Sequence, residues 1–269
     1  MRIQQLEREM GIDIFIRNPK GITLTKDGVE FLSYARQVVE QTNLLEERYK
    51  SHTETRELFS VSSQHYAFVV NAFVSLLKRA DMTRYELFLR ETRTYEIIED
   101  VKNFRSEIGV LFLNGYNRDV LTKMFDDNRL TYTSLFKARP HIFVSKSNPL
   151  AKHKVVSLED LEDFPYLSYD QGIHNSFYYS EEILSQIPHK KSIVVSDRAT
   201  LFNLLIGLDG YTIATGILNS NLNGDNIVSI PLDVDDEIDI VYLKHQKATL
   251  SKMGEKFLDN LVKEVTFDD

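Results

Sequence analysis

A run of polar residues stands where a short apolar segment of the chain changes into a helical one. Ser62, Ser63, Gln64, His65 and Tyr66 supply hydroxyl, amide, imidazole and phenol groups at consecutive positions. Hydroxyls and backbone N–H groups at the start of a helix suit a carboxylate or another anion. Open α/β sheets bind ligands at the carboxyl ends of their strands. These five residues therefore predict contacts to a small-molecule ligand.

Catalytic and metal-binding patterns find little support in the sequence. The seven histidines are dispersed, with no pair at the helical spacing of a metal site, and cysteine is absent. There is no G-x-S-x-G elbow, Walker A loop or dinucleotide fingerprint. His65 beside Ser62 and Ser63 has the residue types of a base and a nucleophile, but a ligand hydrogen bond or ordinary packing explains it better. The sequence predicts a protein that is not an enzyme, with no metal and no cofactor.

The composition is that of an ordinary globular protein. Hydrophobic residues make up 42% and charged residues 27% of 269, enough for two or three compact units. No segment reaches the ~18 apolar residues of a membrane span. The first residues are polar and cysteine is absent. We therefore expect a cytoplasmic protein without a secretory signal and without a membrane partner.

The charge distribution assigns any DNA contact to the front of the chain. The net charge of −8 argues against a nucleic-acid binder over the whole surface. Residues 1–26, in contrast, carry five basic residues against three acidic ones. An excess of two charges is too small to establish DNA binding by itself.

The first 24 residues have the pattern of the end of a winged helix. Residues 2–10 carry apolar side chains at helical spacing, and Gly11 suits the C-cap of that helix. Residues 12–16 and 22–24 alternate as short strands, with the turn Asn-Pro-Lys-Gly at 18–21 between them.

A long helix is predicted to follow. Thr25 suits its N-cap, Asp27 favours its first turn, and the apolar stripe continues to about Ser51. These residues make about seven turns, more than an average helix. The stripe drifts between three and four residues, as expected of a helix that pairs with another. An ordinary core helix is the alternative.

From residue 58 strands and helices alternate, which favours parallel sheets with helices on both faces. The predicted strands are 58–62, 85–90, 108–113, 130–137, 141–145, 192–195, 211–215, 227–230 and 238–243. The predicted helices are 66–79, 94–104, 158–163, 176–186, 198–208 and 251–265.

Two motifs near the N-terminus resemble the LysR-type transcriptional regulators. Residues 5–17, QLEREMGIDIFIR, are similar to the string that joins the recognition helix of this family to its wing. Residues 21–28, GITLTKDG, are similar to the segment that opens its linker helix. Weaker similarity continues along the chain, at residues 89–101, 108–111, 144–151, 157–161 and 207–215.

The resemblance implies an α/β fold in three parts. Residues 1–24 would be a winged-helix remnant, containing the end of the recognition helix and the wing, and residues 25–57 a dimerisation helix and hinge. The rest would be a two-lobed effector domain like a type 2 periplasmic binding protein. Its lobe I would comprise 58–134 plus 232–269 and its lobe II 135–231, joined by two crossing strands.

The resemblance also places an effector in the cleft between the lobes. Besides the residues at 62–66, it points to Arg93, Thr94, Asn114, Gly172, His174 and Asp197. A helix cap is the alternative role for Thr94 and Asp197, and an exposed surface charge for Arg93. Aromatic and amide side chains around the cleft suggest a small polar effector that is amino-acid-like or carboxylated.

The chain departs from the family pattern at its start, where about thirty residues of the DNA-binding head have no counterpart. We expect a truncated regulator; a form unable to bind an operator by itself is the alternative. The remaining candidates for DNA contact are Arg2, Gln4, Arg17 and Lys20. Cations of the wing would contact phosphates, which position the protein without reading bases. Solvated surface charges are the alternative interpretation.

The predicted function is a ligand-responsive, DNA-binding transcription regulator. Effector binding would shift the angle between the lobes and rearrange an oligomer. The implied partners are operator DNA, the effector, further copies of the chain in a homodimer or homotetramer, and RNA polymerase. The alternatives are a solute-binding protein of a transporter, which the long helix disfavours, and a regulator variant lacking operator binding.

Overall fold

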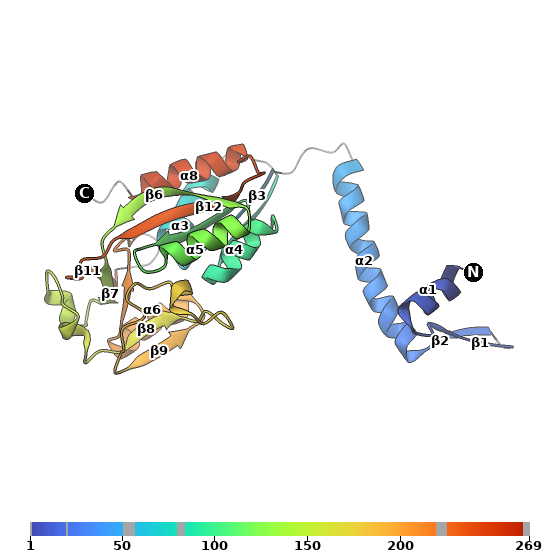
Figure 1. Ribbon diagram of the computed structural model, residues 1–269, viewed down its shortest axis with the longest axis horizontal. Helices are drawn as coiled ribbons and strands as arrows, with labels where there is room; N and C mark the ends of the chain where they lie inside the picture. The colour runs from blue at the N-terminus through green and yellow to red at the C-terminus, as the bar shows by residue number, and fades with distance from the viewer. Residues whose placement is uncertain (1, 20, 51–56, 80–83, 219–224, 266–269) are drawn as a thin grey trace. The chain divides into compact units, whose positions relative to one another are not determined.

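The computed structural model describes residues 2–19, 21–50, 57–79, 84–218 and 225–265 (Figure 1). The chain divides into two compact units, residues 1–55 and 56–269.

The N-terminal unit consists of a short helix, a hairpin and a long helix. These elements are α1 (Arg2–Met10), β1 (Phe15–Asn18), β2 (Gly21–Leu24) and α2 (Lys26–Lys50). β1 and β2 pair antiparallel, and Gly11 adopts a φ of +69° just after α1. The predicted end of the first helix at Gly11 is therefore confirmed.

The start of α2 packs tightly against the segment before the hairpin. The Thr25 hydroxyl accepts a hydrogen bond from the Gly28 N–H at 2.7 Å, which confirms the predicted N-cap. A Cβ atom on Gly28 would lie 2.1 Å from the carbonyl oxygen of Ile14. Only glycine allows this approach, which explains the last residue of the GITLTKDG motif.

The first sheet of the second unit has the strand order β4-β3-β5-β12-β6. Its strands are β3 (Glu57–Ser63), β4 (Tyr85–Glu91), β5 (Ile108–Leu113), β6 (Leu130–Ala138) and β12 (Ile238–His245). β3 is parallel to β4 and β5, whereas β12 is antiparallel to β5 and β6. The expectation of parallel sheets is thus wrong at β12, because the chain returns through this strand in the opposite direction. It is also wrong in the second sheet, where one strand runs antiparallel to both of its neighbours.

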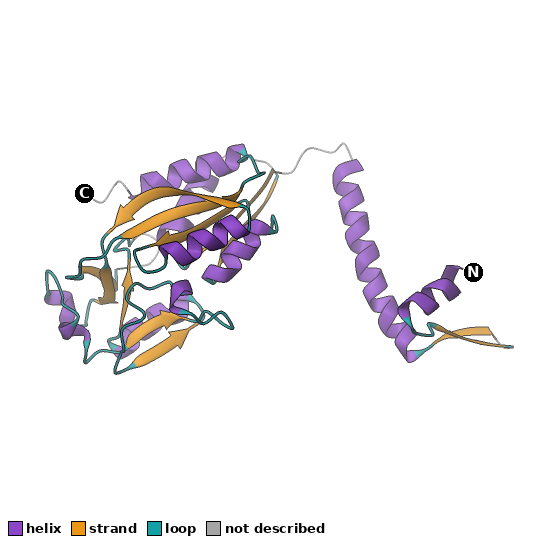
Figure 2. Ribbon diagram, viewed as in Figure 1, coloured by secondary structure: helices purple, strands orange, loops and turns teal. Residues whose placement is uncertain are grey.

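Helices cover both faces of this sheet (Figures 1 and 2). They are α3 (Ala67–Arg79) and α8 (Lys252–Val265) on one face, and α4 (Thr94–Lys102) and α5 (Arg118–Asp127) on the other. All residues of β5 are buried, because Val110 and Phe112 face the first pair of helices and Leu111 and Leu113 the second. The apolar run at 108–113 is explained by this two-sided burial.

The second sheet has the order β11-β7-β10-β8-β9. Its strands are β7 (His141–Ser145), β8 (Tyr166–Tyr169), β9 (Ser192–Val195), β10 (Tyr211–Ala214) and β11 (Ile227–Pro231). Helix α6 (Arg198–Leu208) packs on one face through Leu201 and Leu205. Short 3-10 turns η1 (Pro149–Lys152), η2 (Glu159–Leu161) and η3 (Phe177–Tyr179) lie in the connections.

We call the part built on the first sheet the first lobe and the part built on the second sheet the second lobe. The chain crosses between them after β6 and again before β12, and the Leu232 N–H donates to the Pro140 carbonyl at 3.0 Å where the crossings meet. The predicted two-lobed α/β fold is confirmed. The predicted limits of the lobes stay predictions, although β6 continues to pair with β12 as far as Ala138.

Two local predictions in the second unit are wrong. The helix expected at 176–186 is only the single turn η3, and the helix expected at 158–163 is the turn η2. The aromatic residues at 177–179 fit a helical spacing, but the backbone turns away from the helical conformation at Ser180, where ψ is 147°, and this ends the turn. Helix α5 and strand β8 were not anticipated, because each is short and interrupts its apolar spacing with polar residues.

Among the described residues, none of the helices is both long and apolar enough to cross a bilayer.

Candidate functional site

A pocket lies between the two lobes, beside the carboxyl end of β3. Its walls are mostly apolar and include Phe68, Phe112, Phe143, Leu201, Phe202, Ile213 and Ile238. Its cavity volume is about 40 Å³. One water needs roughly 10–15 Å³ by this measure. The pocket therefore has room for a few waters.

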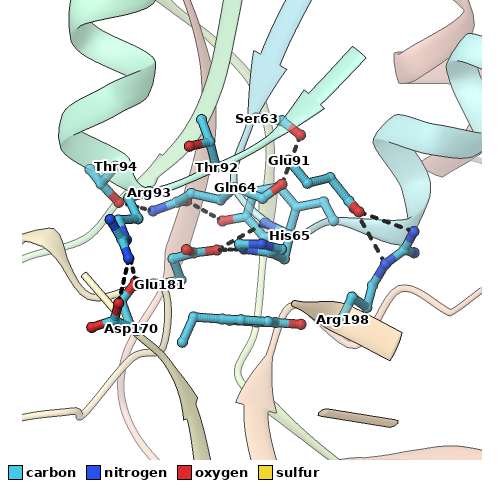
Figure 3. Close-up of polar contacts among 12 residues, drawn as sticks. Ser63, Gln64, His65, Glu91, Thr92, Arg93, Thr94, Asp170, Glu181 and Arg198 are labelled. Carbon is cyan, nitrogen blue, oxygen red and sulfur yellow. Dashed lines mark hydrogen bonds and ion pairs between the residues drawn. The ribbon is translucent and has the colours of Figure 1, made fainter. Parts of the chain in front are cut away.

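The Glu181 carboxylate lines this pocket and points toward His65 (Figure 3). Glu181 comes from the segment between β8 and β9 of the second lobe. Its Oε2 accepts the backbone N–H of His65 at 2.9 Å and lies 2.8 Å from the His65 Nδ1. Its Oε1 accepts a hydrogen bond from Gln171 Nε2 at 3.1 Å. The side chain is 3% exposed, so bulk water screens the interaction with His65 only weakly.

The His65 imidazole is held between charged and aromatic neighbours. Its ring stacks on Tyr169 with centroids 4.1 Å apart. Burial by itself would lower the pKa of His65, but the hydrogen bond and charge of Glu181, helped by Glu91, outweigh burial and raise it. The protonated imidazole is therefore the form that the closed lobes favour.

Glu182 is a second buried carboxyl group beside Glu181. Its Oε1 accepts the backbone N–H of Tyr169 at 2.8 Å. Burial, and then the charge of Glu181, raise the pKa of Glu182 well above its usual value. The two adjacent glutamates thus have different environments. Glu181 contacts the His65 imidazole and the Gln171 amide, whereas Glu182 has no such side-chain partner among the described residues.

Ion pairs between the lobes flank the Glu181 contact (Figure 3). On one side Arg198 Nε of α6 lies 3.3 Å from Glu91 Oε1 at the end of β4. Burial raises the pKa of Glu91, and Arg198 and His65 offset only part of this effect. On the other side Arg93 Nη2 lies 2.5 Å from Asp170 Oδ2. The lobes are thus joined by charges on both sides of the pocket.

Among the residues predicted at 62–66, His65 and Tyr66 line the pocket. Gln64 lies behind them, where its Nε2 donates to Thr94 Oγ1 at 2.6 Å and its Oε1 accepts from the Tyr66 hydroxyl at 2.7 Å. Ser62 donates to Asp100 Oδ2 at 2.6 Å, inside the first lobe. The Ser63 hydroxyl donates to the Gln64 carbonyl. Several polar groups of residues 62–66 therefore already form hydrogen bonds within the protein.

The structure places Arg93, Thr94 and Gly172 together at the lobe interface. Arg93 is the N-cap residue of α4, and the Thr94 N–H donates to Gln171 Oε1 of the other lobe at 3.2 Å. Gly172 has a φ of +61°, and a Cβ atom there would lie 2.7 Å from Arg93 Nη1. Glycine at this position makes room for the guanidinium. These residues hold the lobes together, and their contact with an effector remains a prediction.

The other predicted residues lie farther from the pocket. Asn114 accepts the N–H groups of Tyr116 and Asn117 at 3.1 Å each, which shapes the turn after β5. His174 stacks on Tyr95 with ring centroids 3.5 Å apart. Asp197 is exposed and caps α6 by accepting the Thr200 N–H at 2.8 Å. Effector contacts by Asn114, His174 and Asp197 stay predictions.

The sequence interpretation missed several residues that line the pocket: Glu181, Glu182, Arg198 and Thr212. The two glutamates fell in a predicted helix, where an acidic pair usually marks a solvated face. Arg198 directly follows Asp197, the N-cap of α6. Its place at the start of a helix was the sequence signal that could have indicated a position at the pocket.

The N-terminal unit presents its DNA-binding candidates around α1 and the hairpin. Gln4 and Arg17 line a shallow groove with Glu7 and Arg8. Arg17 Nη2 lies 3.2 Å from Glu7 Oε2, and its side chain stays 44% exposed. The buried Glu7 carboxylate also accepts the N–H groups of Ile14 and Phe15, which fixes the hairpin to α1. Arg2 begins α1, and Lys20 lies outside the described residues.

Comparison with known proteins decides the family. The sequence profile of the LysR substrate-binding domain matches residues 62–266. The chain belongs to the LysR family. LysR-type regulators bind DNA and small-molecule effectors and form oligomers, and they are not enzymes. The chain is accordingly a ligand-responsive transcription regulator, as predicted, and the transporter alternative is set aside.

Individual LysR-type relatives are distant. The regulator CzcR of Bacillus subtilis is 20% identical over 97% of this chain and 85% of its own length. The dual regulator GltC of Bacillus subtilis is 26% identical over 64% of this chain and 55% of its own length. The solved structure of OxyR from Corynebacterium glutamicum has a TM-score of 0.57 at 14% identity, covering 97% of this chain and 80% of that one. The structural likeness supports the two-lobed fold alone.

Among the residues that the structure describes, no group of three or more histidine, aspartate or glutamate side chains is arranged to hold a metal ion.

Proposed function

We propose that this LysR-type regulator binds its effector in the pocket between the lobes. The observation that carries the proposal is the pocket's lining, which combines an apolar floor with the charged groups of His65, Glu181 and Arg198 from both lobes. A pocket of this kind is the usual form of a small-molecule site. The effector is amino-acid-like or carboxylated, and the protein acts in the cytoplasm.

Effector binding would change the balance between closed and open lobes. The pocket is too small for such a molecule while the ion pairs Arg198–Glu91 and Arg93–Asp170 hold the lobes together. A ligand that binds the open form better shifts the population toward it. That shift would rearrange the oligomer and, through it, the DNA-binding elements and their contact with RNA polymerase.

A thermal-shift screen of the full chain against amino acids and organic acids tests the pocket. A ligand at 100 times its Kd stabilises a protein by about 2.7 kcal/mol, which raises the Tm of a chain of this size by roughly 5–10 °C. We expect such a ligand to lose most of this effect in Arg198→Gln and to keep it in Lys190→Gln. Lys190 is exposed and paired with Glu162, away from the pocket. Equal responses of the two variants would refute the site.

DNA binding is proposed for the N-terminal unit, with Arg2, Gln4, Arg17 and Lys20 as contacts. Fluorescence anisotropy of the full chain with duplex DNA, measured at several salt concentrations, tests it. Loss of one phosphate contact in Arg17→Ala should weaken binding and reduce the slope of log K against log salt by about 1. An unchanged slope of log K against log salt in this variant would show that Arg17 does not contact a phosphate. If the parent chain does not bind DNA, the alternative interpretation, a regulator that lacks operator binding, is favoured.

A further inference from the structure

The carboxylate of Glu181 occupies a receptor that the two lobes build together. Its hydrogen-bonding partners are the His65 N–H, the His65 imidazole and the Gln171 amide, at 2.9, 2.8 and 3.1 Å. The Gln171 amide is itself anchored to the first lobe, because its Oε1 accepts the Thr94 N–H. A buried carboxylate satisfied by a cation and by N–H donors is the arrangement that a bound acid would have.

The same receptor opens into the apolar part of the pocket. His65 and Glu181 line the pocket together with Phe68, Phe112 and Ile213. A molecule seated on the apolar floor would bring an acid group to the place that Glu181 now fills. Glu181 and such a molecule cannot share the His65 donors, because each N–H group serves one strong acceptor at a time.

We propose that Glu181 is a tethered competitor, whose carboxylate fills the acid-binding position of the effector pocket until a carboxylic acid with a small apolar body displaces it. This inference rests on the proposed function, since it assumes that the pocket is the effector site. It narrows the effector to a carboxylic acid with a small apolar body and adds the contact that the effector must break.

Displacement of Glu181 would also act on the lobes. The carboxylate contacts the first lobe through His65, and its release frees the Gln171 amide that bridges to Thr94. A tethered group has a high effective concentration, so free acids compete with it at a disadvantage. Removal of the Glu181 carboxylate should therefore increase the affinity of the pocket for acids.

Chemical rescue of Glu181→Ala in the full chain tests the proposal without a known effector. Loss of the carboxylate leaves the His65 donors unsatisfied and lowers the Tm. We expect 100 mM acetate to raise the Tm of this variant by about 3–6 °C, the shift for a Kd of about 10 mM. Acetamide, which has the same shape without the charge, should not. The exposed-site variant Glu162→Ala, tested with acetate, is the control for general effects of salt.

The ring resonances of His65 report on the site itself. In Glu181→Ala the measured pKa of His65 should fall, and acetate should bring it back toward the parent value. Glu181→Gln, which keeps the side-chain volume, serves if the alanine variant does not fold, and its His65 pKa should fall as well. Equal effects of acetate and acetamide, or a His65 pKa that does not respond to Glu181, would overturn the proposal.

The two hypotheses fail separately. If acetate rescues Glu181→Ala but the screen finds no effector, the acid-binding position stands and the proposed function falls. If the screen finds an effector that binds the parent chain and Glu181→Ala equally, the pocket stands and Glu181 is not a competitor.

Discussion

At the scale of single residues, the pocket is governed by how burial and charge compete. His65 and Glu182 lie close to the same carboxylate, Glu181, and both have a raised pKa. The effect on the charge of the two side chains is opposite. A raised pKa favours the charged form of His65, which pairs with Glu181, whereas it favours the neutral form of Glu182.

The stability that His65 contributes should depend on pH. Burial lowers its pKa in the folded protein, but Glu181 and Glu91 outweigh burial and raise it. This stability is therefore present below the unfolded pKa near 6.5 and is lost as pH rises through the folded pKa. We expect the Tm difference between the parent and His65→Gln to shrink from pH 5.5 to pH 8.5. A difference independent of pH would contradict this.

Glu182→Gln should stabilise the protein at neutral pH. Burial and the charge of Glu181 raise the pKa of Glu182, so its ionisation costs stability as pH rises above its unfolded value near 4.5. Glutamine keeps the acceptor for the Tyr169 N–H and removes this cost. Thermal melts should show a gain of at least about 2 °C at pH 7 that disappears near pH 4.5. A lower Tm at pH 7 would mean that the charged form is needed.

At the scale of helices and strands, local signals in the sequence determine some elements and contacts between the lobes determine others. Capping residues and apolar spacing determined where α2, α6 and β5 lie, because these signals act within a few residues. The segment 170–182 has weaker local signals, and its contacts with the first lobe determine its conformation. That segment contains Gly172, His174 and Glu181, and it is where the helix prediction failed.

Asp197 tests the difference between a cap and an effector contact. Its carboxylate accepts the Thr200 N–H, and this hydrogen bond lowers the pKa of Asp197. Asp197→Ala should lower the Tm by roughly 2–4 °C, the loss expected for one helix cap in a chain of this size, while Asp197→Asn should retain most of it. The stabilisation by an effector should be the same in both variants. A smaller ligand response in Asp197→Ala, with an unchanged Tm of the free protein, would instead assign it to the effector site.

At the scale of the whole molecule, we propose that assembly depends on the apolar residues that α2 exposes. Tyr34, Val38 and Leu45 are 63%, 66% and 58% exposed, and Val38 lies seven residues from Phe31 and from Leu45. A repeat of seven is the spacing of helices that pair side by side. LysR-type regulators form oligomers, and this stripe is the surface on α2 suited to that role.

Val38→Glu should dissociate the oligomer. A charge buried against a partner helix is costly, so sedimentation should show a dimer or larger species for the parent and monomers for the variant. Ser33→Glu adds the same charge on another face of α2, where Ser33 is exposed, and should leave the assembly intact. A parent chain that sediments as a monomer would rule out dimerisation through α2.

The sequence by itself determined the family, the class of fold and most element positions of this protein. These follow from periodicity, caps and short motifs, whose physical causes lie within one or two turns of chain; Thr25, Gly28 and the buried run of β5 are examples. The sequence also placed His65 and Tyr66 at the pocket. Only the tertiary structure decided what faces them. Glu181 lies 116 residues from His65, and Asp170 lies 77 residues from Arg93. Such pairs depend on how two lobes meet, which no local pattern records.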